Sequence, residues 1–148
     1  EGSVTHEYLG FVLAGGSVSS VRLGSMGTID RATSKFLELA ASLATEAETQ
    51  SAAEHLRKLV WEKLESVLPA DTDTIFICAD GRLASVPWGA LPGKETSTFV
   101  LERYGIVMVP HGQFLLEQLQ RDPKGNSATT SHLIVSNVNY DAAGDLTV

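Results

Sequence analysis

The stretch Thr74-Ile-Phe-Ile-Cys-Ala79 is a continuous apolar run that is followed directly by Asp-Gly at 80–81. A short apolar run bounded by turn residues is typical of a strand buried on both faces of a parallel sheet. A second run of this kind, 104–109, ends at Pro110. The two runs predict two strands of the same sheet.

Two amphipathic helices are predicted before these strands. The first has Thr28 as its N-cap and an apolar stripe at helical spacing. This stripe comprises Ile29, Ala32, Phe36, Leu39, Ala40 and Leu43. The second begins at a capping box formed by Ser51 and Glu54, after a polar loop at 45–50, and is stopped by Pro69. Its stripe comprises Ala52, Leu56, Leu59, Val60, Leu64 and Val67.

The remaining elements complete the prediction of an α/β fold. Apolar segments at 7–13 and 18–23 flank a Gly-Gly turn and predict an amino-terminal β-hairpin. A short helix is predicted at 113–119, and a further strand begins at Leu133 as part of a right-handed βαβ unit. The order of elements predicts a mostly parallel sheet flanked by helices. The apolar residues predicted to face inward from the short helix are Phe114, Leu115 and Leu119.

Composition excludes several classes of protein. The 148 residues carry a net charge of -7, which argues against a nucleic-acid partner. The longest apolar runs are too short to cross a membrane, and a single cysteine excludes a disulfide scaffold. We therefore expect a cytoplasmic protein without metal or cofactor. Because the chain begins at Glu1 without a methionine, we interpret it as a fragment of a larger protein.

Candidate ligand-binding residues follow the predicted strands, because ligands of open parallel sheets bind beyond the carboxyl ends of the strands. Asp80 and Gly81 favour a turn over a site. His111 favours a turn or helix-start histidine over a catalytic imidazole. Asn137 and Asp141 are weak candidates for cation ligands, because the segment lacks the glycine and glutamate of a calcium loop.

Cys78 is the only thiol in the sequence, and it lies inside the first apolar run. This placement predicts a buried core residue more strongly than a nucleophile. The segment 83–91 after it is apolar, but it contains Pro87 and Gly89, which disfavour a regular strand. We expect an irregular arm pressed onto the sheet, with Trp88 buried.

The segment from Ile75 to Pro92 resembles the signature of CHAT domains, which are caspase-like domains often found with TPR repeats. A hydrophobic strand is followed in that family by Asp-Gly, Leu, Pro, an aromatic residue and a small-small-Leu triplet. The matching residues are Asp80, Gly81, Leu83, Pro87, Trp88, Ala90 and Leu91. Weaker likenesses cover nearly the whole chain, at 8–13, 59–68, 101–107 and 134–141.

The resemblance implies part of a caspase-like fold and a cysteine endopeptidase with a His-Cys dyad and no cofactor. It places the catalytic His-Gly and Ala-Cys segments beyond the Asn-Tyr-Asp at 139–141. No catalytic role is therefore assigned to His111 or Cys78, and the chain is expected to be inactive alone. Residues 1–148 are interpreted as the amino-terminal part of a CHAT domain, without an internal linker.

The resemblance also implies partners. These are the catalytic remainder of the same protein, TPR repeats, and a protein partner or substrate. The alternative is an inactive caspase-like module that binds another protein. A small-molecule site near Asp80, His111 and Asn137 is the least favoured hypothesis. Half of a sheet would also expose an unpaired edge, which predicts self-association through that edge.

Overall fold

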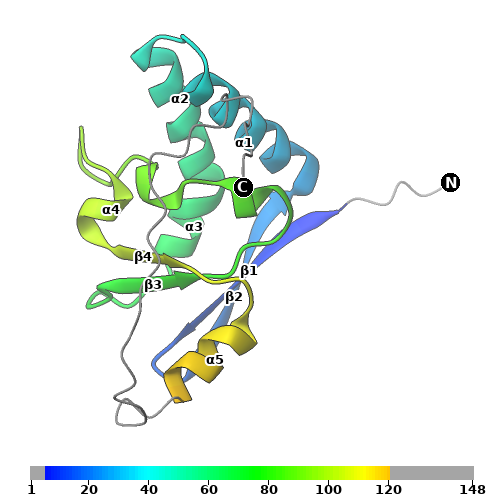
Figure 1. Cartoon of the computed structure of the whole chain (residues 1–148), viewed down its shortest axis with the longest axis vertical. Coiled ribbons are helices and arrows are strands. Elements are labelled where there is room, and N and C mark those ends of the chain that lie inside the picture. Colours follow the sequence, from blue (N-terminus) through cyan, green and yellow to red (C-terminus); the bar gives the residue numbers. More distant parts are fainter. Residues whose placement is uncertain (1–5, 121–148) are drawn as a thin grey trace, which may run out of the picture.

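A computed structural model of the chain describes residues 6–120. Two small sheets lie beside a group of helices, and helix α5 lies on the other side of the β3–β4 sheet from α1, α2 and α3 (Figure 1). The strands are β1 (Glu7–Ala14), β2 (Ser17–Ser25), β3 (Thr74–Ile77) and β4 (Gly105–Met108). The α-helices are α1 (Met26–Ala41), α2 (Glu46–Leu56), α3 (Glu62–Glu65), α4 (Val100–Arg103) and α5 (Gly112–Gln120).

The amino-terminal β-hairpin is confirmed. Strands β1 and β2 pair in antiparallel register and are joined at Gly15 and Gly16. Both glycines have positive φ angles, of 56° and 77°, as a tight turn that matches the twist of the strands requires. Outward-facing side chains of β1 are exposed, and Phe11 has 70% of its surface accessible. The hairpin therefore has one face toward the core and one apolar face toward solvent.

Helix α1 differs from its prediction at both ends. It begins at Met26 with Ser25 as N-cap, so Thr28 lies inside the helix. The physical reason is that β2 runs directly into the helix, because the Met26 N–H donates to the His6 carbonyl at 2.9 Å. At the other end, Ala40 is exposed and Leu43 lies beyond the helix, fully exposed. The prediction that these two residues belong to the apolar stripe of the helix was wrong.

The second predicted helix begins earlier than expected. Thr45, and not Ser51, is the N-cap, and it forms the capping box with Glu48. The Thr45 N–H donates to the Glu48 carboxylate at 3.0 Å, and the Glu48 N–H donates to the Thr45 hydroxyl at 3.3 Å. The loop predicted at 45–50 is therefore mostly helix. Both Thr45-x-x-Glu48 and Ser51-x-x-Glu54 fit the same pattern, so spacing alone could not separate them.

A wide π-turn at Arg57–Trp61 connects α2 to α3. Helix α3 ends at Glu65, a few residues before Pro69. The stripe holds into the π-turn, where Leu56 just before it and Val60 within it are fully buried, but Val67 at its predicted end is 37% exposed. A π-turn shifts the helical face by one residue, which explains why the regular spacing fails after it.

Strands β3 and β4 pair in parallel, with Ile75 opposite Ile106 and Phe76 opposite Val107. An α/β architecture with an amino-terminal hairpin is confirmed. Over residues 6–120 it contains one antiparallel and one parallel pair of strands, so the mostly parallel sheet is not shown. The predicted strand from Leu133, and with it the βαβ unit, lies outside the described residues.

The prediction that 74–79 is buried on both faces was wrong. The strand ends at Ile77, and only its inner side chains join the core. Phe76 points to the outer face and is 45% exposed. Cys78 directly follows the strand and is exposed, which corrects its predicted place in the core. The alternation of the strand continues through it, so Ile77 and Ala79 face the core while Cys78 lies on the outer side with Phe76.

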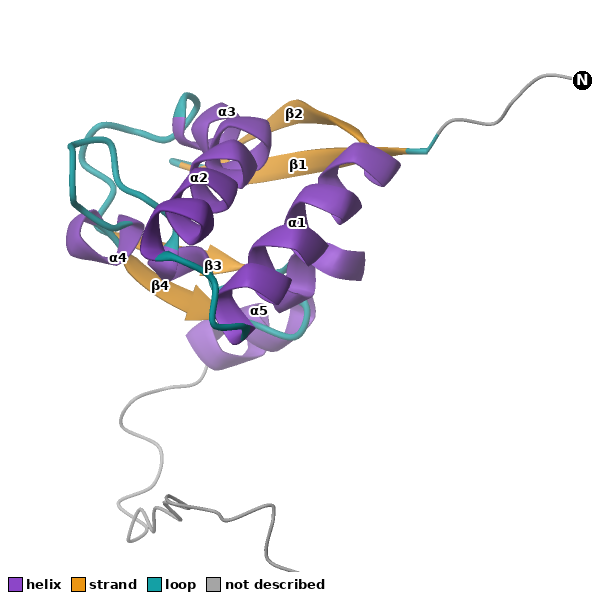
Figure 2. Cartoon of the chain, turned by 90° about the horizontal axis from the view of Figure 1, so that it is seen from above, coloured by secondary structure: helices purple, strands orange, loops and turns teal. Residues whose placement is uncertain are grey.

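Helix α5 was predicted to bury apolar residues and does not. It has no buried residue, and Phe114 and Leu119 are 39% and 69% exposed. Seen from above, α5 is partly hidden beneath α1, on the far side of the molecule from the viewer (Figure 2). Its amphipathic pattern is real, but its apolar side does not join the core of the described residues.

The core lies between the helices and the inner faces of the two sheets. The helical segments contribute Ile29, Phe36, Leu56, Val60 and Trp61, and the segment after β3 contributes Leu83, Val86, Trp88 and Leu91. Strands β3 and β4 add Ile75, Ile77 and Ile106 at its edge. No helix within residues 6–120 has the length and apolar character needed to cross a membrane.

Candidate functional site

The signature segment 80–91 forms an arm of two short 3₁₀ turns, Gly81–Ser85 and Trp88–Ala90. Its apolar side chains Leu83, Val86, Trp88 and Leu91 are all buried, as the sequence predicted. Asp80 begins the first turn, and its carboxylate accepts the Gly81 N–H at 2.7 Å. The predicted turn at Asp80-Gly81 is confirmed, and the arm is part of the core.

Gly81 has a backbone conformation that other residues adopt only with strain. Its φ of 57° lies in the left-handed region, and an added Cβ would lie 2.6 Å from the Tyr8 hydroxyl. That hydroxyl donates to Asp30 at 2.8 Å and accepts the Arg82 N–H at 3.3 Å. Tyr8 therefore joins β1, α1 and the arm at one point, which we name the Tyr8 junction.

The Tyr8 junction also changes the chemistry of the phenol. Burial, and then the hydrogen bond to Asp30, raise the pKa of Tyr8 above its usual value. Both effects favour the neutral phenol, because the ionised form would lose water and face the Asp30 carboxylate. At neutral pH the residue is thus a stable hydrogen-bond donor, and its role here is to hold the arm in place.

Three aromatic side chains gather behind the arm. The ring of Trp61 lies 6.1 Å from that of Trp88 and 5.8 Å from that of Tyr104, in tilted and edge-on arrangements. Such pairs add about 0.5–1.5 kcal/mol each to the stability expected from burial alone. Trp88, which is 4% exposed, thereby contacts the π-turn through Trp61, and Trp61 in turn contacts Tyr104, the residue before β4.

Arg57 fixes the far end of the arm. The residue is only 7% exposed, and its Nε donates to the Pro92 carbonyl at 2.8 Å. Another guanidinium nitrogen donates to Glu65 at 2.8 Å, and Glu65 also accepts a hydrogen bond from Tyr104. We name Arg57, Glu65 and Pro92 the Arg57 clamp. A planar guanidinium suits this role because it can bond a carbonyl and a carboxylate at once.

A groove of about 1190 Å³ runs between the Arg57 clamp and the loop 93–99. Strong local bonds close this loop, because the Gly93 N–H donates to the Thr98 carbonyl at 2.7 Å and Pro92 pairs with Phe99. The charged residues of the groove have both signs, and Arg57 is already paired with Glu65. The groove therefore presents a mixed polar surface without a free buried charge at Arg57.

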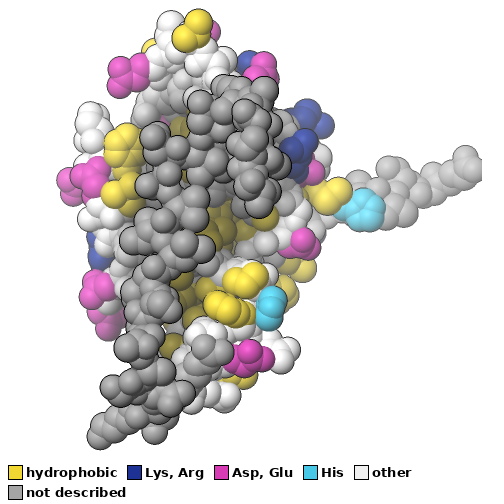
Figure 3. All heavy atoms as spheres, in the orientation of Figure 1, with side chains coloured by type: hydrophobic (Ala, Val, Ile, Leu, Met, Phe, Trp, Pro, Cys, Tyr) yellow, Lys and Arg dark blue, Asp and Glu magenta, His cyan; other side chains and the backbone are white. Residues whose placement is uncertain are grey.

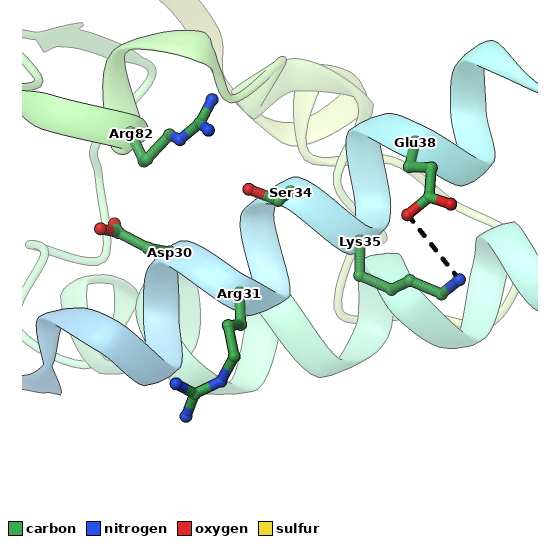
Figure 4. A pocket seen from close by; sticks show the side chains of 6 residues that line it. All are labelled: Asp30, Arg31, Ser34, Lys35, Glu38 and Arg82. Carbon is green, nitrogen blue, oxygen red and sulfur yellow. Dashed lines mark ion pairs between the residues drawn. The ribbon is translucent and has the colours of Figure 1, made fainter.

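A shallower hollow of about 460 Å³ lies between α1 and the arm (Figure 4). Arg31 and Arg82 line it but point away from one another, and Lys35 turns toward Glu38, 4.0 Å away. The other lining residues are Asp30 and Ser34. The cationic groups do not converge on a common point, so this hollow has no ready-made anion site.

The two strand exits meet at one edge of the β3–β4 sheet. The Cys78 thiol faces the Pro110 carbonyl across 3.8 Å. The neighbouring His111 accepts the Phe114 N–H on its Nδ1 at 3.0 Å, so it caps α5. The helix-start interpretation of His111 is confirmed. Asn137 and Asp141 lie outside the described residues, and within residues 6–120 no cluster of His, Cys, Asp and Glu could hold a metal ion.

Sequence reasoning missed the residues that hold the arm. The burial of Leu83, Trp88 and Leu91 was predicted, but the Tyr8 junction and the Arg57 clamp were not. Arg57 had a signal that could have been used, since it is a basic residue next to Leu56 on the apolar stripe of a predicted helix. Tyr8 had none, because Asp30 and Arg82 are distant from it in sequence.

A comparison of the sequence with models of protein families finds one match. The family model of the CHAT domain matches residues 50–147, which include the whole arm, the π-turn and both strands of the parallel sheet. No curated protein and no solved structure matches the chain.

Proposed function

The chain belongs to the CHAT domain family of caspase-like peptidases, and from this premise we propose that it is the amino-terminal, non-catalytic part of such a domain. In this role it supports a catalytic part and helps to present a protein partner or substrate. The observation that carries the proposal is the position of the signature side chains. Leu83, Trp88 and Leu91 are buried in the core and are not arranged around a cleft.

The chemistry of the strand exits supports the same proposal. A cysteine peptidase brings a thiolate, an imidazole base and oxyanion donors together. His111 Nδ1 is occupied as the cap of α5, and the Cys78 thiol faces the Pro110 carbonyl. Neither residue occupies a catalytic position in the family resemblance, so we assign both to the framework.

Peptidase assays of the full chain test this proposal. We expect no cleavage of a fluorogenic peptide library, and the same result for the Cys78→Ala variant. Turnover that is sensitive to a thiol-directed inhibitor and lost in Cys78→Ala would overturn the non-catalytic assignment. Mixing the chain with the remainder of its domain, produced separately, should restore cleavage if the two parts complete one another in trans.

The exposed face of the hairpin favours a second candidate, an inactive module that binds another protein. Leu9, Phe11 and Leu13 follow one another on this face and are each more than half exposed. Contiguous apolar surface of this kind marks interaction sites. Size-exclusion chromatography separates the two candidates, since co-elution with the remainder of the domain supports a completed peptidase and independent elution supports a free module.

A further inference from the structure

The outer face of the β-hairpin is a continuous apolar surface. Strand pairing places Leu13 opposite Val18 and Phe11 opposite Ser20. Residues that lie opposite one another on antiparallel strands share a face, so these four lie on the same side of the hairpin as Leu9. Every apolar member of this group is more than half exposed in the part of the chain that the structure describes.

This face differs in its charge from the rest of the surface. The hairpin lies on the opposite side of the molecule from β4 and α5 in the view from above (Figure 2). On the face shown in Figure 3, hydrophobic side chains lie among charged and polar ones. Residues 7–25 contain only two charged residues, Glu7 and Arg22, and these form an ion pair. The apolar row of the hairpin therefore has no unpaired charge beside it.

The absence of net charge on the hairpin decides which partner suits this face. A partner that is recognised through its charge finds no unpaired group here to bind. A second copy of the chain also carries a net charge of -7, and two such copies repel one another wherever their charged surfaces meet. The hairpin is a place where two copies can approach without bringing unpaired charges together.

We propose that the chain forms a symmetric dimer in which the outer faces of two hairpins pack on one another. A two-fold axis parallel to the strands exchanges the two strands between the copies. Each residue of β1 then faces the residue of the second copy that is equivalent to its own cross-strand neighbour. Phe11 packs over Ser20 of the second copy, where the small side chain leaves room for the ring, and Leu13 packs over Val18.

The area of the face is sufficient for a dimer of modest stability. The exposed apolar side chains of one hairpin amount to on the order of 400 Å². Together with the polar residues between them, two such faces bury about 1,000 Å² in total, which is the lower bound for a specific interface. We therefore expect a dimer that dissociates at micromolar concentration. The proposal rests on the second candidate function, because it names the protein that the hairpin binds.

Sedimentation equilibrium of the full chain, from low to high micromolar concentration, tests the dimer. Phe11→Thr removes the ring, and Ser20→Phe keeps the apolar surface but fills the space that receives the ring. Leu43→Thr is the matched control, because Leu43 is fully exposed and lies beyond α1, away from the hairpin. Both hairpin positions face solvent and favour strand-forming residues, and thermal melting of each variant checks the fold.

We expect the dissociation constant to rise about tenfold or more in Phe11→Thr and in Ser20→Phe, and to stay unchanged in Leu43→Thr. A chain that remains monomeric throughout would overturn the proposal. Equal association in Phe11→Thr would do the same, because another surface would then be responsible. Equal or tighter association in Ser20→Phe would also overturn it, since apolar area and not the fit of Phe11 would then drive pairing.

The dimer and the non-catalytic assignment fail in different experiments. Sedimentation involves no peptidase activity and no catalytic part of the domain. A monomeric chain would remove the dimer and leave the assignment of Cys78 to the framework as it stands. Thiol-dependent cleavage by the chain would overturn that assignment and leave the dimer as it stands.

Discussion

The arm at 80–91 and helix α5 at 112–120 each contain four large apolar residues, yet they differ in regularity and in burial. The arm is irregular, contains Pro87 and Gly89, and buries Leu83, Val86, Trp88 and Leu91. Helix α5 is regular and amphipathic and buries nothing within the described residues. Regular periodicity is thus a poor guide to which apolar segment of this chain forms the core.

The difference lies in how each segment is held. The arm is fastened at both ends, by the Tyr8 junction at Gly81 and by the Arg57 clamp at Pro92. Helix α5 is held at its start by the cap from His111, and its apolar side chains remain open. Burial in this molecule follows from long-range polar contacts that position the chain as much as from hydrophobic pattern.

The largest expected effect comes from removing the indole at the centre of the arm. Trp88→Ala should reduce the free energy of unfolding by about 3–5 kcal/mol, since a buried aromatic side chain is lost and a cavity remains. The control is Leu119→Ala on α5, which should change it by less than about 0.5 kcal/mol. Urea denaturation of both variants measures the contrast, and equal effects would remove the distinction between the two segments.

The next largest effect concerns the clamp. Arg57→Met keeps the length of the side chain but removes charge-assisted hydrogen bonds, and it should destabilise the fold by about 2–3 kcal/mol. Arg22→Met removes an exposed ion pair with Glu7 and should have no measurable effect. Amide exchange in residues 92–99 should rise in Arg57→Met alone. Unchanged exchange there would mean that the arm does not depend on the clamp.

Gly81→Ala tests the Tyr8 junction, which holds the other end of the arm. The substitution puts a side chain in the left-handed region and against the Tyr8 hydroxyl, and we expect a loss of about 2 kcal/mol or slightly more. Gly15→Ala is the matched control, because its φ of 56° is almost the same but no atom lies within 4 Å of the added carbon. The loss in the free energy of unfolding beyond that of Gly15→Ala measures the contact between the added carbon and the Tyr8 hydroxyl. Adding Tyr8→Phe to Gly81→Ala should relieve part of that loss. An excess of zero would show that Tyr8 moves aside freely.

The smallest effect is a pH dependence at the Tyr8 junction. Because burial and then Asp30 raise the pKa of Tyr8, its stabilising contribution is complete below about pH 10, the unfolded value, and is lost as the pH rises through the higher folded value. The pKa of Tyr104 is raised as well, first by burial and then by the Glu65 charge. Unfolding measured from pH 8 to 11.5 should show a shallower alkaline loss in Tyr8→Phe, and identical slopes would contradict this account.

Sequence reasoning predicted the features of this fold that depend on local chemistry. The Gly-Gly turn, the first helical stripe as far as Phe36, the presence of a strand before Asp80 and the burial of Trp88 all follow from residue type and spacing. It failed where two positions matched the same rule, as at Thr45 and Ser51. It also failed where burial depends on what covers a face, as for Cys78 and Leu119.

The candidate site was harder to predict, for the same reason. The turn at Asp80-Gly81 could be predicted from two adjacent residues, but the contacts that hold it come from Tyr8 and Asp30, far away in the chain. Arg57 reaches across 35 sequence positions to the Pro92 carbonyl. Such pairings have no local pattern, and only the folded backbone brings them together.

The closed loop 93–99 has a practical consequence for engineering. Its two ends are pinned to one another by the Gly93 to Thr98 hydrogen bond, and the Val100 N–H donates to the Leu91 carbonyl at 2.9 Å. Its tip at Glu95 and Thr96 is exposed and lies outside the arm. Since each doubling of loop length costs only about 0.6 kcal/mol, a fluorescent reporter domain can be inserted there and should leave the core intact.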